Sequence, residues 1–231
     1  MTWPLLEGHT VSTKSYFASY PETASTIEAW DGTSEAEAPA DHVFGGIYMG
    51  GNTSTSPADM PAVNCCWTAH HPGENNSPFG DTYISDVMRK ASDAFLSAIT
   101  YRTLGTDLLV RCQMGWNRSG LIVAGLLIAE NQLEPEDAIA AVRTARGSNA
   151  LNNKSFVRFL MDGGFPPMPG ERVRYHGSVE SRHGLAVITG VDGKNKSLTL
   201  LSISCPTGSY TPVELIQVNY SSVSRGIGVH S

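Results

Sequence analysis

Two apolar runs of different length follow each other in the middle of the chain. Leu108 to Val110 has the length of a buried strand, and Leu121 to Ala129 has the length of a helix. The segment between them, Cys112 to Ser119, is short and mostly polar. This pattern predicts a strand, a tight loop and a helix that opens on the last two residues of the loop.

Other segments around this stretch also have clear periods. Apolar residues at helical spacing, or helix-type end signals, predict three more helices, over Ile84 to Ile99, Pro135 to Arg146 and Lys154 to Met161. Two strand-length runs precede them, His42 to Gly50, which glycines interrupt, and Ala62 to Cys66. These elements together are expected to form one domain of strands and helices.

The C-terminal part has a different pattern. After Pro166 to Gly170, which we interpret as a linker, strand-length runs alternate with turns. These runs are Arg172–His176, Gly184–Val191, Ser197–Ser204 and Val213–Val218. Asp192 and Gly193 predict a hairpin turn between the second and third runs. Four or five short strands in about sixty residues favour a small all-β domain over residues 171–231, which we expect to be an SH3-like barrel.

Composition narrows the setting of the protein. The net charge is −6, with 10 basic and 18 acidic residues in 1–169 and 6 and 4 in 170–231, so the overall charge favours neither nucleic acid nor a membrane surface. Residues 11–40 are rich in Ser, Thr, Ala and Glu, and residues 1–40 are expected to form a partly docked N-terminal arm. We expect no signal peptide, no membrane span and no zinc site among the four cysteines, which favours a reducing, cytoplasmic location.

The loop between the strand and the helix carries the candidate chemistry. Its backbone N–H groups can turn inward to form an anion-binding nest, with the positive end of the helix dipole behind them. The residues of this nest would be Gln113, Met114, Gly115, Trp116, Asn117 and Arg118. An anion bound there would lie against the sulfur of Cys112.

The residues at the two ends of the loop suit nucleophilic chemistry. A thiol attacks only as thiolate, a form that helix N-termini and neighbouring cations favour, so Cys112 is the candidate nucleophile. The planar guanidinium of Arg118 can bind two oxygens of a phosphate at once. The hydroxyl of Ser119 can donate a hydrogen bond to the sulfur when the thiolate has to leave again.

Cysteine, five residues, arginine and serine form a signature that resembles the phosphate loop of the cysteine-based protein tyrosine and dual-specificity phosphatase superfamily. The resemblance implies an α/β, dual-specificity-phosphatase-like fold, a central sheet flanked by helices, over residues 41–165. It also implies hydrolysis of phosphate monoesters through a cysteinyl-phosphate, without metal or cofactor. The short catalytic region and the absence of Trp-Pro-Asp favour the compact dual-specificity type, which acts on phosphotyrosine and phosphoserine or phosphothreonine in proteins or peptides.

An acid is needed to protonate the leaving oxygen. Asp81 lies 31 residues before Cys112 and directly before a predicted helix, a spacing similar to that of the acid in compact dual-specificity phosphatases. Asp86 and Glu74 are alternatives for this role. The loop that precedes Asp81 includes His70 and His71, for which no further metal ligand lies at a suitable spacing, so we expect no metal site.

Several features leave alternatives open. Arg111 stands where the family usually has histidine, which leaves the ionisation of the nucleophile open. Cys66, or Cys65, occupies about the place of a cysteine that forms a disulfide with the nucleophile in the phosphoinositide branch, although a buried free thiol is the simpler interpretation. The loop contains no lysine, which disfavours inositol headgroups. Its end, Trp116 to Arg118, is similar to that of RNA 5′-triphosphatases, so a triphosphorylated RNA 5′ end is the second candidate substrate.

Two functions of other classes also use an anion-binding loop. A non-catalytic phosphate-binding module would need the nest without Cys112 or an acid. A rhodanese-type sulfurtransferase would need the cysteine but has no use for Asp81. The presence of cysteine, arginine, serine and aspartate together favours the phosphatase.

Overall fold

The computed structural model describes residues 40–54, 60–67, 74–81, 85–178, 183–202 and 214–225. The N-terminal arm, His70, His71 and Cys205 lie outside the described residues. Within the described part, no helix is long and apolar enough to cross a bilayer.

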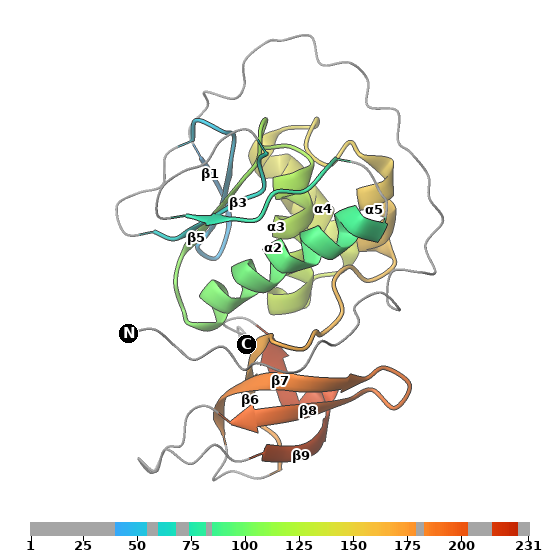
Figure 1. Cartoon of the computed structure of the whole chain (residues 1–231). Coiled ribbons are helices and arrows are strands. Elements are labelled where there is room, and N and C mark those ends of the chain that lie inside the picture. The colour runs from blue at the N-terminus through green and yellow to red at the C-terminus, as the bar shows by residue number, and fades with distance from the viewer. Residues whose placement is uncertain are drawn as a thin grey trace.

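The first part of the chain is built on a mixed five-stranded sheet with the helices packed beside it (Figure 1). Its strands are β1 (Asp41–Phe44), β2 (Ile47–Gly50), β3 (Ala62–Asn64), β4 (Asn75–Asn76) and β5 (Leu108–Arg111). Their order is β1-β2-β5-β3-β4, with every neighbouring pair parallel except β1 and β2. The predicted strand over residues 42–50 is therefore a hairpin, because Gly45 and Gly46 have φ of 49° and 81° and turn the chain back.

Four helices accompany this sheet, and their expected positions are confirmed. They are α2 (Ser85–Thr103), α3 (Arg118–Asn131), α4 (Pro135–Arg146) and α5 (Lys154–Met161). The middle helix, α3, contacts α2, α4, α5 and strands β2 and β5. Because it is surrounded in this way, it is apolar on nearly every side, as its long hydrophobic run indicates. The α/β class predicted for this part is confirmed.

The second part of the chain is an antiparallel five-stranded sheet. Its strands are β6 (Arg172–Tyr175), β7 (Gly184–Asp192), β8 (Ser197–Ser202), β9 (Glu214–Asn219) and β10 (Val223–Arg225). The order is β10-β6-β7-β8-β9, and no pairing of the edge strands β9 and β10 is found among the described residues. The all-β prediction is confirmed, but a closed barrel is not seen there, so the SH3-like barrel stays a prediction.

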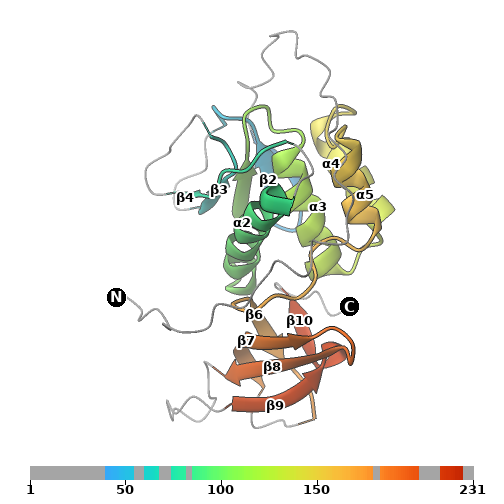
Figure 2. The same cartoon turned by 45° about the vertical axis from the view of Figure 1, so that its right-hand side comes forward.

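The predicted hairpin turn joins β7 to β8. Asp192 accepts hydrogen bonds from the N–H groups of Lys194 and Asn195, each at 3.1 Å, and so fixes the turn. Above this sheet, β6 contacts α2 and β10 contacts α3 (Figure 2). The segment expected to be a linker is packed rather than free, because Met168 is buried in the first hydrophobic core and Gly170 donates to Ile188 of β7 at 2.8 Å.

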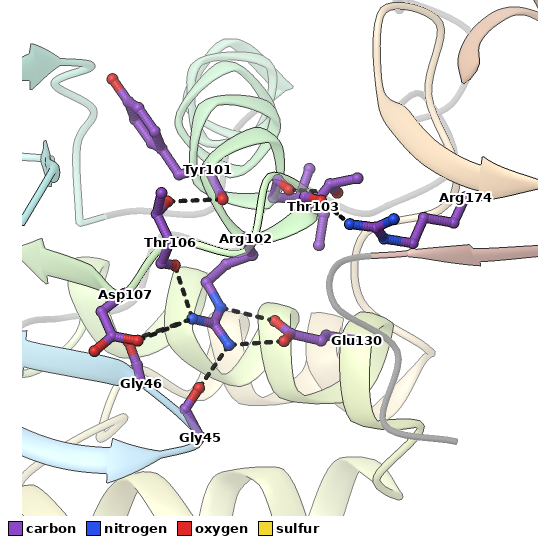
Figure 3. Close-up of polar contacts among 10 residues, drawn as sticks. Gly45, Gly46, Tyr101, Arg102, Thr103, Thr106, Asp107, Glu130 and Arg174 are labelled. Carbon is purple, nitrogen blue, oxygen red and sulfur yellow. Dashed lines mark hydrogen bonds and ion pairs between the residues drawn. The ribbon is translucent and has the colours of Figure 1, made fainter. Parts of the chain in front are cut away.

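A buried arginine fixes the start of the central strand β5 (Figure 3). Arg102, at the end of α2, donates to both carboxylate oxygens of Glu130 in α3, at 2.8 and 3.1 Å. It also donates to the carbonyls of Gly45 at 2.6 Å and Thr106 at 2.9 Å. One side chain therefore joins the β1–β2 turn, the α2–β5 connection and the central helix.

Candidate active site

The candidate loop lies between the end of β5 and the start of α3. In open α/β sheets the carboxyl ends of parallel strands meet at one edge, and ligands bind there. Strands β2, β5, β3 and β4 run parallel and bring their ends to this edge. The helix begins at Arg118, as the sequence predicts.

Four successive carbonyl groups of the loop have partners outside it. Gln113 accepts from the N–H of Asn52 at 3.1 Å, and Trp116 accepts from that of Leu151 at 3.2 Å. The carbonyls of Met114 and Gly115 accept from the guanidinium of Arg146, at 3.3 and 3.2 Å. In a trans peptide the N–H points away from the preceding carbonyl, so the N–H groups of residues 114–117 turn to the opposite side, toward the interior of the loop.

Glycine at the middle of the loop is required by its geometry. Gly115 has φ of 69°, a left-handed conformation that side chains disfavour. A Cβ at this position would lie 2.6 Å from the carbonyl carbon of Gly50 and 2.7 Å from the nitrogen of Gly51. The loop can therefore pack directly on the end of β2 only because residue 115 has no side chain.

Three of the sequence-predicted site residues meet at this loop. The sulfur of Cys112 lies 3.3 Å from the hydroxyl of Ser119, and both residues are buried. Arg118 donates from Nη1 to the carbonyls of Cys65 at 3.1 Å and Phe79 at 3.3 Å. These contacts place the guanidinium between the end of β3 and the segment that carries Asp81.

Asp81 is bound to the loop itself. Asn117 donates from Nδ2 to Oδ2 of Asp81 at 3.0 Å, and Asn153 donates to Oδ1 at 2.8 Å. The carbonyl of Asp81 also accepts from Asn153 at 3.0 Å. A carboxyl group 31 residues before the cysteine in sequence is thereby held beside the loop that the cysteine opens.

The two alternative acids are placed differently. Glu74 forms an ion pair with Arg111, with Oε2 3.0 Å from Nε, so its carboxylate is directed at the end of β5. The side chain of Asp86 lies outside the described residues. Asp81 is thus the candidate that the described contacts bring to the loop.

The two cysteines that follow β3 are free thiols in the core. The thiol of Cys66 contacts Oε1 of Gln113 at 2.9 Å. Burial, followed by the neighbouring Cys112, raises the pKa of the Cys65 thiol well above its usual range. A disulfide of either one with Cys112 on oxidation stays a prediction.

Two residues that the sequence did not single out organise the site. Asn153 caps α5 by accepting from the N–H groups of Ser155 and Phe156, while its amide nitrogen binds Asp81. Arg146 turns the loop carbonyls outward and also pairs with Asp41 at 2.6 Å. An asparagine before a helix indicates a cap, and an arginine in the last turn of a helix indicates a dipole contact, but neither pattern names its second partner. Among the described residues, no group of three or more potential metal ligands is found.

Residues 67–164 match the family model of the dual specificity phosphatase catalytic domain. No curated protein matches this chain in sequence. Solved structures that resemble it include human DUSP28, at 18% identity over 54% of this chain and 94% of that chain, with a TM-score of 0.46. A mouse putative dual specificity phosphatase complexed with zinc tungstate has 15% identity over 60% of this chain and 94% of that chain, with a TM-score of 0.45.

A phosphatase from Cydia pomonella, PTP-2, is also similar, at 13% identity over 64% of this chain and 98% of that chain, with a TM-score of 0.43. The family-model match covers the segment that carries Asp81, the loop from Cys112 to Ser119 and helices α2 to α5. It therefore includes all of the candidate catalytic residues. Residues 67–164 thus match a dual specificity phosphatase catalytic domain, which is consistent with the resemblance to the cysteine-based protein tyrosine phosphatase superfamily.

Proposed function

We propose that this protein hydrolyses phosphate monoesters through a cysteinyl-phosphate intermediate, without a metal. Cys112 is the nucleophile, Arg118 and the loop amides bind the phosphate, and Asp81 is the general acid and base. Ser119 assists the departure of the thiolate. The observation that carries the proposal is the contact between Asn117 and Asp81, because it joins the acid to the loop that begins at the nucleophile.

The first step transfers the phosphoryl group to the protein. The Cys112 thiolate attacks phosphorus, an S–P bond forms, and the bond from phosphorus to the leaving oxygen breaks. The inward amides of the loop and the Arg118 guanidinium stabilise the charge on the equatorial oxygens. Asp81 gives its proton to the leaving oxygen, which departs as an alcohol or phenol.

The second step releases phosphate and restores the thiolate. Asp81, now ionised, takes a proton from a water molecule that attacks phosphorus, and the S–P bond breaks. The hydroxyl of Ser119, 3.3 Å from the sulfur, can donate to the thiolate as it leaves. Each oxygen of Asp81 has a second lone-pair position besides the one used by Asn117 or Asn153, so the carboxyl group can carry its proton without losing these contacts.

The substrate class proposed is phosphotyrosine and phosphoserine or phosphothreonine in proteins. The short catalytic region and the absence of Trp-Pro-Asp before α2 support this choice. Phosphopeptides, phosphoinositides and triphosphorylated RNA, assayed side by side, test this choice. Faster turnover of the RNA than of every phosphopeptide would favour the RNA 5′ end, with which the loop sequence Trp116 to Arg118 agrees.

The reaction type is tested with para-nitrophenyl phosphate and thiosulfate as competing substrates. We expect phosphate release from the ester and no sulfur transfer from thiosulfate. Cys112→Ser should remove the activity, and Asp81→Ala should retain phosphate binding with little turnover. Cyanide is added as the acceptor for sulfur. Sulfur transfer from thiosulfate to cyanide without ester hydrolysis would show that the protein is a sulfurtransferase and not a phosphatase. Phosphate binding without either reaction would show that it is a non-catalytic binding module.

A further inference from the structure

The residue directly before the nucleophile makes contacts on two sides of the site. Arg111 ends β5, and its side chain is only 4% exposed. On one side it forms a two-point ion pair with Glu74, through Nε and Nη2. On the other side its Nη1 donates to the carbonyl of Ser54 at 2.5 Å. A guanidinium can make these contacts together because its donors form a rigid, planar fork.

The contact with Glu74 fixes one end of the segment that carries the acid. Residues 74–81 start at Glu74, continue as β4 beside β3, and end at Asp81. Asn64 of β3 holds the segment through the side chain of Asn76 at 2.9 Å and the N–H of Ser77 at 2.9 Å. The segment 74–81 is therefore attached at its start to β5, the strand that leads to Cys112. At its end it is attached to the loop through Asn117.

The contact with Ser54 fixes the turn behind the loop. Residues 51–54 close a turn in which Ser54 both donates to the carbonyl of Gly51 and accepts from its N–H, at 3.1 and 2.9 Å. Asn52 in this turn donates to the carbonyl of Gln113, the first of the outward carbonyls of the loop. Arg111 thus touches both the acid-bearing segment and the turn that supports the phosphate loop.

We propose that Arg111 and Glu74 are positioning residues that hold Asp81 at the distance from Cys112 that protonation of the leaving group requires. The inference rests on the proposed function, and it assigns to the pair an effect on one step of it. Neither side chain is proposed to touch the substrate. Glu74, considered from the sequence as an alternative acid, has instead the role of an anchor for the acid.

A positioning role for Arg111 and Glu74 predicts that their substitution slows some substrates more than others. A purely structural role predicts the same loss for every substrate. If Asp81 is misplaced, an ester with a poor leaving group loses the proton it needs, whereas an ester with an acidic leaving group departs without one. We expect Glu74→Gln, which keeps the shape of the side chain but not its charge, to lower kcat/KM for phenyl phosphate on the order of 10- to 100-fold. The loss on 2,4-dinitrophenyl phosphate should stay within about threefold.

The control is a buried pair of the same kind far from the loop. Glu130→Gln changes the partner of Arg102, which is as buried as Arg111 but lies at the opposite end of β5. Both variants should lower the melting temperature, and both are assayed at a temperature at which circular dichroism shows them folded. Glu130→Gln should change kcat/KM for the two esters by the same small factor. Glu74→Asp, which retains the carboxylate, should recover part of the phenyl phosphate activity.

A second test combines Glu74→Gln with Asp81→Asn. If Glu74 acts through Asp81, the double variant should be no slower on phenyl phosphate than Asp81→Asn alone. Losses that multiply, or a Glu74→Gln loss that is equal for both esters, would overturn the positioning role. If Asp81→Asn itself retains full activity on phenyl phosphate, the acid assignment of the proposed function fails, and this inference fails with it.

Discussion

The central strand β5 has a buried arginine–glutamate pair at each end. Near its start, Arg102 pairs with Glu130, and at its last residue Arg111 pairs with Glu74. In the first pair both side chains are at most 2% exposed, and in the second they are 4% and 13% exposed. The two pairs are alike in chemistry and burial but lie at opposite edges of the sheet.

The edge decides what each pair can do. The partners of Arg102 are a helix, a hairpin turn and the connection into β5, all of which belong to the framework. Arg111 contacts the acid-bearing segment and the turn behind the phosphate loop, because it lies at the carboxyl end of the strand, where parallel sheets form their sites. If Arg111 and Glu74 position Asp81 as proposed, a buried ion pair acquires a functional role through its neighbours and not through its own chemistry.

The largest effect is expected at Cys112, for which the start of β5, where Arg102 pairs with Glu130, has no counterpart. Cys112→Ser should lower kcat/KM for para-nitrophenyl phosphate by a factor on the order of 10⁴ or more, because an alcohol at this position is a far weaker nucleophile than a thiolate. Steady-state release of para-nitrophenol measures this loss. Retention of more than a tenth of the activity would remove Cys112 from the reaction.

The next effect concerns the acid that the Arg111 pair is proposed to hold. Asp81→Asn should lower kcat for phenyl phosphate by about 10²- to 10⁴-fold, the usual contribution of a general acid. The affinity for inorganic phosphate should be nearly unchanged, because Asp81 is not one of the proposed phosphate-binding groups and the amide oxygen keeps one of the two contacts with Asn117 and Asn153. Competition by phosphate gives the affinity, and turnover gives the rate. A rate loss that is equal for 2,4-dinitrophenyl phosphate would speak against the acid role.

Near the start of β5, where Arg102 pairs with Glu130, we expect a substitution to lower stability and not activity. Glu130→Ala should lower the free energy of unfolding by about 3–5 kcal/mol, because it leaves the guanidinium of Arg102 buried without its anionic partner. Urea unfolding followed by circular dichroism measures this change. The folded fraction should keep the leaving-group dependence of the unaltered protein. A changed dependence would mean that both ends of β5 act on the site.

The smallest effect comes from a thiol beside the carboxyl end of β5, where the N–H of Cys65 donates to the carbonyl of Arg111 at 2.8 Å. Burial and the neighbouring Cys112 raise the pKa of the Cys65 thiol, so the folded protein keeps its proton when the unfolded chain, with a thiol pKa of about 8.5, begins to lose it. The stability due to this group is present below that value and is lost as the pH rises further. Cys65→Ala should therefore reduce the decline in stability between pH 8 and pH 10, as measured by urea unfolding. An unchanged decline would assign it to other groups.

Much of the site could be predicted because its signals are local. The motif from Cys112 to Ser119 contains the candidate nucleophile, the arginine and the glycine in one stretch, and the local sequence pattern predicts the observed bounds of α4 and α5. Asp81 was predicted from spacing, and the structure places it at the loop through Asn117.

What could not be predicted depends on contacts between distant segments. Strand β4 consists of two asparagines without an apolar pattern, and it forms because β3 offers a parallel edge. Arg111 and Glu74 are 37 residues apart, and neither sequence position indicates the other. Packing of the C-terminal sheet on α2 likewise depends on single contacts, such as that of Arg174 with the carbonyl of Thr103 at 3.2 Å.

The central feature of the proposed mechanism is a covalent phosphate on the sulfur of Cys112. The direct measurement is acid quenching of the protein within milliseconds of mixing with 2,4-dinitrophenyl phosphate, followed by peptide mass spectrometry. We predict phosphate on the peptide that contains Cys112, at a level that falls as the substrate is consumed. A burst of dinitrophenol with no phosphate on that peptide, or with phosphate on a different residue, would contradict the account.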